Sequence, residues 1–295
     1  MPEAARAVVV IAPNWLGDAV MALPAISDVR RAVSPGKLLV AARQPVADVF
    51  KLAPSVDEVH TLEWNGRWGS RAAFTADVHA LGEVGADAAL VLPNSFASAW
   101  LAKQAGIPER WGYRSDLRGG LLSRAVRRPK SGIHQGAYYQ HLTGELGFAS
   151  GPLEPELTVA DEAIATARRR LHDRGWNGER PLIALAPGAA YGTAKRWIPA
   201  HVARLIDDLV RLRGATCVLV GSRADAATTR QIQAGLDDET RHDVIDLTGE
   251  TTLEGLAAVL KLARACVSND SGAMHLAAAI GTRVVAIFGP TRFVC

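Results

Sequence analysis

The chain has 295 residues, of which 48% are hydrophobic and 21% are charged, and its formal net charge is +3. This length suits about two domains, and the composition is that of an ordinary globular protein. The small net charge argues against a protein that coats nucleic acid, so no nucleic-acid partner is expected.

The cysteines Cys217, Cys266 and Cys295 form no CxxC pair and have no metal-type spacing to histidine. Scattered thiols are typical of a reducing compartment, and the first two lie in apolar runs that predict buried positions. The apolar run at 7–12 is too short for a signal peptide, and no run approaches the roughly 18 apolar residues of a membrane span. We therefore expect a cytoplasmic protein.

Short β-branched runs alternate with helical segments along the first half of the chain. The run AVVVIA at 7–12 predicts a buried strand, and a helix is expected at about 18–33. Further strands are expected at 37–41 and 88–92. This order predicts an α/β fold with a parallel sheet that is covered by helices on both faces.

A second alternating series follows a proline- and glycine-rich break at 151–155, which predicts a linker. A surface helix is expected at 161–175, so we place the domains at 1–160 and 161–295. The later elements are strands at 182–186, 216–220, 265–268 and 284–288, a short strand that closes at 246–249, and helices at 199–213, 253–263 and 273–280. Two Rossmann-like halves predict a ligand cleft, lined by loops at the carboxyl ends of the strands.

The first candidate site is PNWLGD at 13–18, between the first strand and the first helix. Gly17 allows a tight turn, and Asp18 comes where the helix begins. As a helix N-cap, the carboxylate of Asp18 would accept hydrogen bonds from free amides. At the mouth of the predicted cleft it could instead remove a proton from an acceptor hydroxyl, and the two roles are compatible. Asn14 is a candidate acceptor contact.

The second candidate site is PGAAYGTAKRW at 187–197, between a strand and a helix. Its small residues let backbone amides approach an anion, and Lys195 and Arg196 supply charge for a diphosphate. Gly188 and Tyr191 are further candidate contacts. The spacing of glycine and lysine is not that of a Walker A loop. An ordinary surface turn is the alternative.

The third candidate site is SNDSGAMH at 268–275, again between a strand and a helix. The free amides at the start of a helix can hold a phosphate. Asp270 could orient sugar hydroxyls, while Ser271 and Gly272 reach the phosphates. The alternative is that Asp or Ser caps the helix and that His275 packs beneath it.

Two phosphate-compatible loops in one domain and a lone carboxylate in the other indicate a nucleotide-sugar transferase. A base such as adenine would lie against neighbouring strand ends, at Gly221, Ser222, Thr248 and Gly249. Metal-ligand spacing is absent from both loops. The cations and the helix amides would therefore neutralise the leaving diphosphate without an obligatory cofactor, and a divalent cation would at most stimulate.

A basic segment at 110–130 carries Arg110, Arg114, Arg118, Arg124, Arg127, Arg128 and Lys130. It is either charge for solubility or a rim for an acidic acceptor or an anionic membrane, where each cation adds about 1 kcal/mol. Arg114 and Arg118, with Asn94 after the strand at 88–92, are candidate acceptor contacts. Three tryptophans are expected beside this rim or in the core: Trp64, Trp68 and Trp111.

With these residues in view, the chain resembles the ADP-heptose:lipopolysaccharide heptosyltransferases, and is most similar to heptosyltransferase II. The resemblance extends from Val8 to Thr291. It depends on PNWLGDAVMALPA at 13–25, VLPNSFASA at 91–99, PGAAYGTAKRW at 187–197 and SNDSGAMHLAAA at 268–279. The VLPNSF segment favours heptosyltransferase II over heptosyltransferase I.

The resemblance implies a GT-B fold, in which two Rossmann-like doubly wound domains face a cleft, and an inverting transfer from ADP-heptose to a heptose of the lipopolysaccharide inner core. Domain 1–160 would bind the acceptor and domain 161–295 the nucleotide sugar. By the same likeness Asp18 is the general base, Lys195 binds the diphosphate, and Asp270, Ser271, Gly272 and His275 fall on the donor loop. Family members continue past residues 288–291 with a helix, so we expect this sequence to be truncated at its C-terminal end.

Other interpretations stay open. A nucleotide-sugar epimerase on a similar scaffold would need acid and base groups on both faces of the sugar, whereas one clear carboxylate is found in the first domain. An inactive nucleotide-binding homologue is the non-enzymatic alternative. An NAD enzyme is disfavoured because no GxGxxG follows either first strand. We expect a monomer and leave open a peripheral contact with the cytoplasmic face of the inner membrane.

Overall fold

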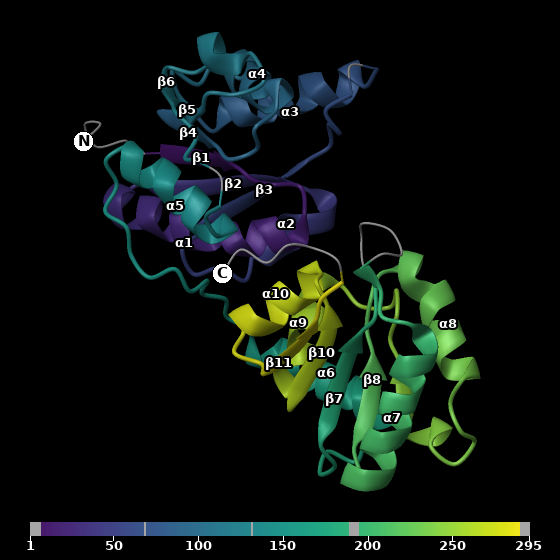
Figure 1. The fold of residues 1–295 in the computed structure, drawn as a ribbon. Coiled ribbons are helices and arrows are strands. Elements are labelled where there is room, and N and C mark those ends of the chain that lie inside the picture. The colour runs from purple at the N-terminus through teal and green to yellow at the C-terminus, as the bar shows by residue number, and fades with distance from the viewer. Residues whose placement is uncertain (1–6, 68, 131, 189–194, 290–295) are drawn as a thin grey trace. The chain divides into compact units, whose positions relative to one another are not determined.

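The computed structural model describes residues 7–67, 69–130, 132–188 and 195–289. The chain divides into two compact units, one ending at Glu156 and the other beginning at Leu157. The boundary expected from the sequence was 160/161. Each unit is a parallel sheet with helices packed on it, as Figure 1 shows.

The first unit contains a six-stranded sheet in the order β3-β2-β1-β4-β5-β6, in which all neighbours are parallel. Its strands are β1 (Ala7–Ile11), β2 (Lys37–Arg43), β3 (Glu58–Leu62), β4 (Ala88–Val91), β5 (Glu109–Tyr113) and β6 (Arg124–Val126). Its helices are α1 (Leu16–Val33), α2 (Gln44–Phe50), α3 (Arg71–Glu83), α4 (Phe96–Gln104), the short 3₁₀ helix η1 (Arg118–Leu121) and α5 (Gln135–Glu145). The strand order reverses between β1 and β4, which makes this the topological switch point where ligands bind in such sheets.

The second unit contains a five-stranded parallel sheet in the order β11-β10-β7-β8-β9. Its strands are β7 (Leu182–Ala186), β8 (Thr216–Leu219), β9 (Val244–Asp246), β10 (Ala265–Asn269) and β11 (Val284–Ile287). Its helices are α6 (Asp161–Asp173), α7 (Pro199–Arg213), η3 (Arg223–Asp225), α8 (Ala226–Ala234), η4 (Arg241–Asp243), α9 (Leu253–Leu262) and α10 (Gly272–Ala279). Here the switch point lies between β7 and β10. The loops that follow these two strands are the two phosphate-compatible segments of the sequence.

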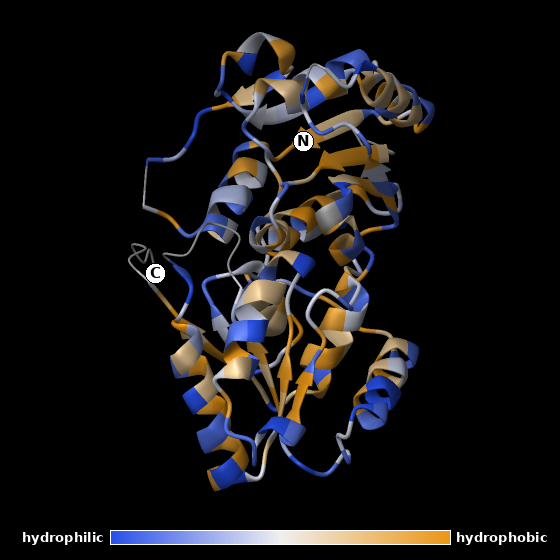
Figure 2. Ribbon diagram, turned by 90° about the vertical axis from the view of Figure 1, so that its right-hand side faces the viewer, coloured by the Kyte–Doolittle hydropathy of each residue, from blue (hydrophilic) through white to orange (hydrophobic). Residues whose placement is uncertain are grey.

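The cores explain why the strands are continuous apolar runs. Helices cover both faces of each sheet, so a central strand has no solvent side. The odd-numbered residues Val9 and Ile11 of β1 pack in one cluster with Leu81 of α3 and Leu101 of α4. Figure 2 shows hydrophobic residues concentrated in the strands of both sheets. The prediction of two Rossmann-like parallel sheets is confirmed.

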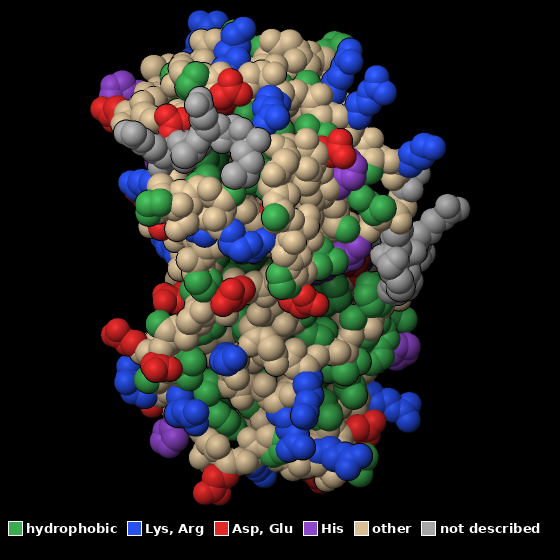
Figure 3. All heavy atoms as spheres, turned by 90° about the vertical axis from the view of Figure 1, so that its left-hand side faces the viewer, with side chains coloured by type: hydrophobic (Ala, Val, Ile, Leu, Met, Phe, Trp, Pro, Cys, Tyr) green, Lys and Arg blue, Asp and Glu red, His purple; other side chains and the backbone are tan. Residues whose placement is uncertain are grey.

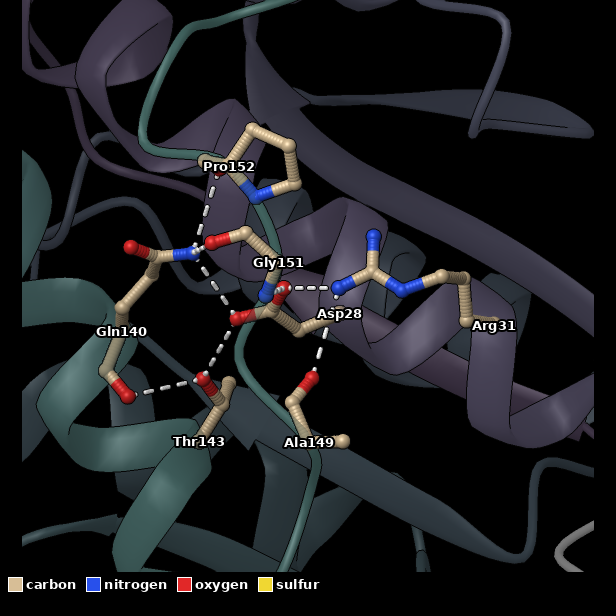
Figure 4. Close-up of polar contacts among 7 residues, drawn as sticks. All are labelled: Asp28, Arg31, Gln140, Thr143, Ala149, Gly151 and Pro152. Carbon is tan, nitrogen blue, oxygen red and sulfur yellow. Dashed lines mark hydrogen bonds and ion pairs between the residues drawn. The ribbon is translucent and has the colours of Figure 1, made fainter.

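A buried carboxylate joins α1 to α5 and to the last segment of the first unit (Figure 4). Asp28 is 1% exposed, and it accepts hydrogen bonds from the Gly151 amide at 2.9 Å and from Nε2 of Gln140 at 3.1 Å. Thr143 and the guanidinium of Arg31 complete its partners. Because α5 and the chain near residue 151 are held by one side chain of α1, the segment that leads out of the first unit starts from a fixed position.

Some local predictions were wrong in their bounds. Helix α1 begins two residues before Asp18, and the segment 247–249 follows β9 instead of belonging to it. The basic segment at 110–130, which had no predicted secondary structure, forms β5, η1 and β6. In the described part of the chain, no helix has both the length and the apolar character that crossing a bilayer requires.

Candidate active site

Asp18 lies at the switch point of the first sheet, directly after β1. It is the third residue of α1, and the N-cap is Trp15, whose side chain makes no capping hydrogen bond. The predicted N-cap role of Asp18 is therefore wrong, because the helix starts earlier. The side chain is half-buried, and this burial raises the pKa of its carboxyl. A carboxylate with a raised pKa is a stronger general base than an ordinary aspartate.

Tyr139 of α5 is a neighbour of Asp18 that the sequence did not indicate. Its side chain is 4% exposed, and burial raises the pKa of its hydroxyl, with a further rise from the negative charge of Asp18. The side chain of Gln135 acts on the pKa of this hydroxyl in the opposite direction and lowers it. Helix α5 was not predicted, so no pattern could have placed Tyr139 near the carboxylate.

Arg118, predicted to contact the acceptor, is instead a structural residue. It is 0% exposed, and Nε donates to the carbonyl of Tyr113 at 2.9 Å. Nη1 donates to the carbonyls of Pro93 and Ser95, whereas Nη2 is buried and has no hydrogen-bond partner among the described residues. Burial lowers the pKa of Arg118 to about 10, so the group still carries its charge at neutral pH. The prediction was wrong because three carbonyls, two from the loop between β4 and α4 and one from the end of β5, converge on this guanidinium.

The other predicted acceptor residues lie at one edge of the first sheet. Asn14 follows β1 and Arg114 follows β5, and both are exposed. Asn94 follows β4 and is half-buried: its Nδ2 donates to the Tyr138 hydroxyl at 2.9 Å, and its carbonyl accepts from Oγ of Ser115 at 2.9 Å. Asn14 and Asn94 therefore flank the switch point. The side-chain amide of Asn94 already donates a hydrogen bond to Tyr138.

Two of the three tryptophans expected beside the rim or in the core, Trp64 and Trp111, lie in the core of the first unit. Trp64 is 4% exposed and meets Phe74 edge to face at 4.7 Å between ring centroids. Trp111 is 1% exposed, and its Nε1 donates to Glu109 at 3.1 Å. Trp68 lies outside the described residues.

In the second unit, an ion pair joins the two predicted phosphate loops. Nζ of Lys195 lies 2.6 Å from Oδ2 of Asp270, and the two side chains are 25% and 22% exposed. The residue predicted to bind the diphosphate is thus paired with the one predicted to orient sugar hydroxyls. Both sit at the switch point of the sheet, where an anionic ligand would meet the amine.

Asn269, the last residue of β10, hydrogen-bonds to one residue directly after β7 and to one directly before α7. It is 2% exposed, and its Nδ2 donates to the carbonyl of Pro187 at 2.6 Å while its Oδ1 accepts from the Trp197 amide at 3.1 Å. Those contacts tie Pro187 and Trp197 to the end of β10. The sequence motif contained Asn269, but nothing in its spacing indicated this role.

Asp225 explains the two glycines at the ends of β7 and β8. A Cβ at Gly188 would overlap its carboxylate, and one at Gly221 would lie 3.1 Å from Oδ2. Oδ2 accepts from the amide of Ser222 at 2.9 Å and from its hydroxyl at 2.7 Å, and the guanidinium of Arg196 lies 3.9 Å from Oδ1. Arg196, Gly188, Gly221 and Ser222 therefore surround one carboxylate, which sequence analysis had not singled out.

The predicted nucleoside residues bring the ends of β8 and β9 together. The amide of Gly249 donates to the carbonyl of Gly221 at 2.8 Å, and Gly249 has a φ of +74°, a conformation that favours glycine. The hydroxyl of Thr248 is buried and has no hydrogen-bond partner within the described part of the chain. A buried hydroxyl of this kind is suited to a ligand that would complete its bonding.

The helix α10 presents the third candidate segment. Its N-cap is Ser271, whose side chain makes no capping hydrogen bond and instead lies 3.1 Å from Oγ of Ser268. Since Asp270 is bound to Lys195, the alternative in which Asp or Ser caps this helix is wrong. The backbone amides at the start of α10, beginning at Gly272, therefore donate no hydrogen bond to a capping side chain. His275 is half-buried, and Tyr191 of the second segment lies outside the described residues.

The described residues contain no group of three or more His, Cys, Asp or Glu side chains that could hold a metal ion. Cys217 and Cys266 are each 0% exposed, and burial raises the pKa of both thiols to about 12. These cysteines are therefore inert core residues, as the apolar runs around them predict.

Comparison with known proteins identifies the family. The family described as glycosyltransferase family 9 (heptosyltransferase) matches residues 75–294. The chain belongs to glycosyltransferase family 9. It is a glycosyltransferase, and the family favours transfer over the epimerase and inactive alternatives.

Members of the family match the chain over nearly its whole length. Lipopolysaccharide heptosyltransferase 2 of Salmonella typhimurium is 32% identical over 96% of this chain and 83% of that protein. Lipopolysaccharide heptosyltransferase 1 of Pseudomonas aeruginosa is 28% identical over 97% of this chain and 79% of that protein. The solved structure of ADP-heptose lps heptosyltransferase II of E. coli is 32% identical, covers 97% of this chain and 85% of its own, and gives a TM-score of 0.86. This likeness confirms the GT-B prediction.

Proposed function

We propose that this family 9 glycosyltransferase moves heptose from ADP-heptose to a heptose of the lipopolysaccharide inner core, with inversion at the anomeric carbon. The observation that carries the proposal is the pair Lys195 and Asp270, which joins two loops at the switch point of the second sheet. The names of the relatives support the heptose donor and the lipopolysaccharide acceptor.

The donor would bind at the carboxyl edge of the second sheet. Lys195, Arg196 and the amides at the N-terminus of α10, those of the N-cap Ser271 and of Gly272, would neutralise the diphosphate, since helix N-termini favour anions. Asp270 would then be free to accept hydrogen bonds from the heptose hydroxyls. The nucleoside would lie against Gly221, Ser222, Thr248 and Gly249, where the Thr248 hydroxyl needs a partner. No metal is obligatory in this scheme, and a divalent cation would at most stimulate.

The acceptor would bind at the carboxyl edge of the first sheet, beside Asn14, Asn94 and Arg114. Asp18 would take the proton of the acceptor hydroxyl as that oxygen bonds to the anomeric carbon and the bond from this carbon to ADP breaks. Such proton transfer contributes about 10²- to 10⁴-fold in rate.

The oligomeric state and the location in the cell belong to the same proposal. The enzyme would act as a monomer in the cytoplasm, with peripheral contact at the cytoplasmic face of the inner membrane, since its acceptor carries a lipid. The absence of a spanning helix among the described residues agrees with a peripheral contact.

The decisive experiment incubates the purified protein with ADP-heptose and a heptosyl-Kdo₂ acceptor and weighs the product. A gain of one heptosyl residue with equimolar ADP release is expected. Isomerised donor in the absence of acceptor would identify an epimerase instead. ADP binding with no product would identify an inactive homologue.

A further inference from the structure

The turn between β5 and β6 presents an exposed leucine in an unusual backbone conformation. Asp116 and Leu117 have φ angles of +46° and +55°, so two consecutive residues other than glycine adopt the left-handed region. This region is costly for a residue with a branched side chain. Leu117 is nevertheless 97% exposed, so its side chain gains no packing inside the protein. A strained turn that exposes a leucine points to a role outside the fold.

Contacts on both sides hold this turn in place. The carboxylate of Asp116 accepts from the Phe96 amide at the start of α4 at 2.6 Å. The hydroxyl of Ser115 donates to the Asn94 carbonyl at 2.9 Å, and the next residue, Arg118, is the buried guanidinium described above. The exposure of Leu117 is therefore built into the structure of the first unit.

Four cations lie at the same edge of the sheet as this turn, and we call them the basic edge: Arg114, Arg127, Arg128 and Lys130. Arg114 follows β5 and the others follow β6, and parallel strands place their carboxyl ends together. All four side chains are exposed, and within the described residues none forms an ion pair. Elsewhere in this unit Arg30 pairs with Asp57. Figure 3 shows that Lys and Arg side chains stand out along the upper part of the face that it presents.

We infer that Leu117 and the basic edge form a docking surface for an anionic lipid bilayer. Unpaired cations are attracted to lipid phosphates, and an exposed leucine gains free energy when it enters the acyl boundary. A polyanionic sugar would explain the cations but not the leucine. A protein partner would need more apolar area than one side chain offers.

The position of the surface suits the proposed function, on which this step rests. The strands β1, β4, β5 and β6 are successive neighbours, so β6 lies three strand spacings, about 15 Å, from β1. Asp18 follows β1 at the same carboxyl edge. A bilayer held at the turn would present a lipid-linked acceptor along the edge that carries the proposed base.

Vesicle binding tests this inference without any turnover. The wild-type chain is mixed with vesicles of phosphatidylglycerol and phosphatidylethanolamine at about 0.15 M salt, and the bound fraction is measured by sedimentation. Leu117→Asn should weaken binding about fivefold or more, because a buried leucine is lost. The double variant Arg127→Gln/Arg128→Gln should weaken it about 25-fold, from about fivefold for each cation. Vesicles of phosphatidylcholine alone should bind weakly.

Matched controls lie on the second unit. Leu212 is 74% exposed on α7, and Arg204 and Arg213 are exposed on the same helix. Leu212→Gln and Arg204→Gln/Arg213→Gln should bind vesicles like the wild type. Leu117→Asn should not lower the melting temperature, since asparagine tolerates the left-handed region.

Two results would overturn the inference. One is vesicle binding that the controls reduce as much as the Leu117 and Arg127/Arg128 variants do. The other concerns the KM of the variant Arg127→Gln/Arg128→Gln for two acceptors, one carried in vesicles and one without its lipid. If the KM for the delipidated acceptor rises as much as the KM for the vesicle-borne acceptor, the basic edge is a sugar site. Because vesicle binding needs neither donor nor transfer, failure of this surface and failure of the proposed reaction are separate outcomes.

Discussion

Nζ of Lys195 lies 2.6 Å from Oδ2 of Asp270, although 75 residues separate them in the chain. The pair joins the loops that follow β7 and β10, on either side of the switch point of the second sheet. The carboxylate compensates the charge of the amine. A bound diphosphate would therefore compete with Asp270 for Lys195 and release the carboxylate toward the sugar.

Replacement of Lys195 should weaken nucleotide binding. Lys195→Ala removes a charge-assisted contact with the diphosphate, which is worth about 1.5–3 kcal/mol, so the Kd for ADP should rise at least tenfold. Titration calorimetry measures this change. The control is Lys103→Ala, an exposed lysine at the end of α4, which should bind ADP like the wild type. Unchanged ADP affinity in Lys195→Ala would reject the role of Lys195.

Replacement of Asp270 should distinguish binding of the sugar from binding of the diphosphate. Asp270→Asn frees the amine of Lys195 from its ion pair, so ADP should bind as tightly as before or more tightly. The KM for ADP-heptose should rise instead, because the sugar loses a charged acceptor of hydrogen bonds. If ADP affinity fell as in Lys195→Ala, Asp270 would serve only to orient the lysine.

The variant Asp18→Asn should fold and bind donor but lose turnover by about 10²- to 10⁴-fold. Near-wild-type turnover would reject Asp18 as the base.

The effect of Asp18→Asn on the stability of the fold also has a definite sign. Burial raises the pKa of this carboxyl in the folded state, so ionisation of Asp18 destabilises the fold at neutral pH. Asp18→Asn should therefore melt at the same or a higher temperature at neutral pH, and any advantage should vanish as the pH falls through the raised pKa.

The same raised pKa predicts the acid limb of the pH profile. The wild-type kcat/KM should fall as the pH decreases through the pKa of Asp18, because a protonated carboxyl cannot act as a base. That limb should lie above the ordinary value of 3.8. A limb at or below 3.8 would contradict either the burial of Asp18 or its role.

Arg118 should matter for stability and not for acceptor affinity. Arg118→Met leaves the carbonyls of Pro93 and Tyr113 without their donor, at a cost of about 2–4 kcal/mol in the free energy of unfolding. Urea unfolding measures this cost. Arg114→Met, the exposed neighbour, should leave stability within about 0.5 kcal/mol of the wild type. A stable Arg118→Met protein with a raised acceptor KM would restore the original prediction for this residue.

Local pattern determined the fold and most of the candidate site. The sequences of β1 and β7 are continuous apolar runs, because helices cover both faces of a parallel sheet and no residue of a central strand faces solvent. Such runs predict buried strands. The bounds of α7 were predicted correctly, since Pro199 starts the helix and Gly214 ends it in the left-handed region. The polar loops after β1, β7 and β10 stood out because strand, turn and helix signals bracket them.

Only the tertiary structure decided which partners the polar side chains around the site have. Arg118 looked like a surface cation, since arginine is almost never fully buried unless it is paired. Its partners are carbonyls of turns that meet only in the folded unit. Asp225 beneath Gly188, and Tyr139 beside Asp18, likewise come together from distant segments. Periodicity records which face of an element is buried, whereas the partner of a polar atom depends on which segments the fold brings into contact.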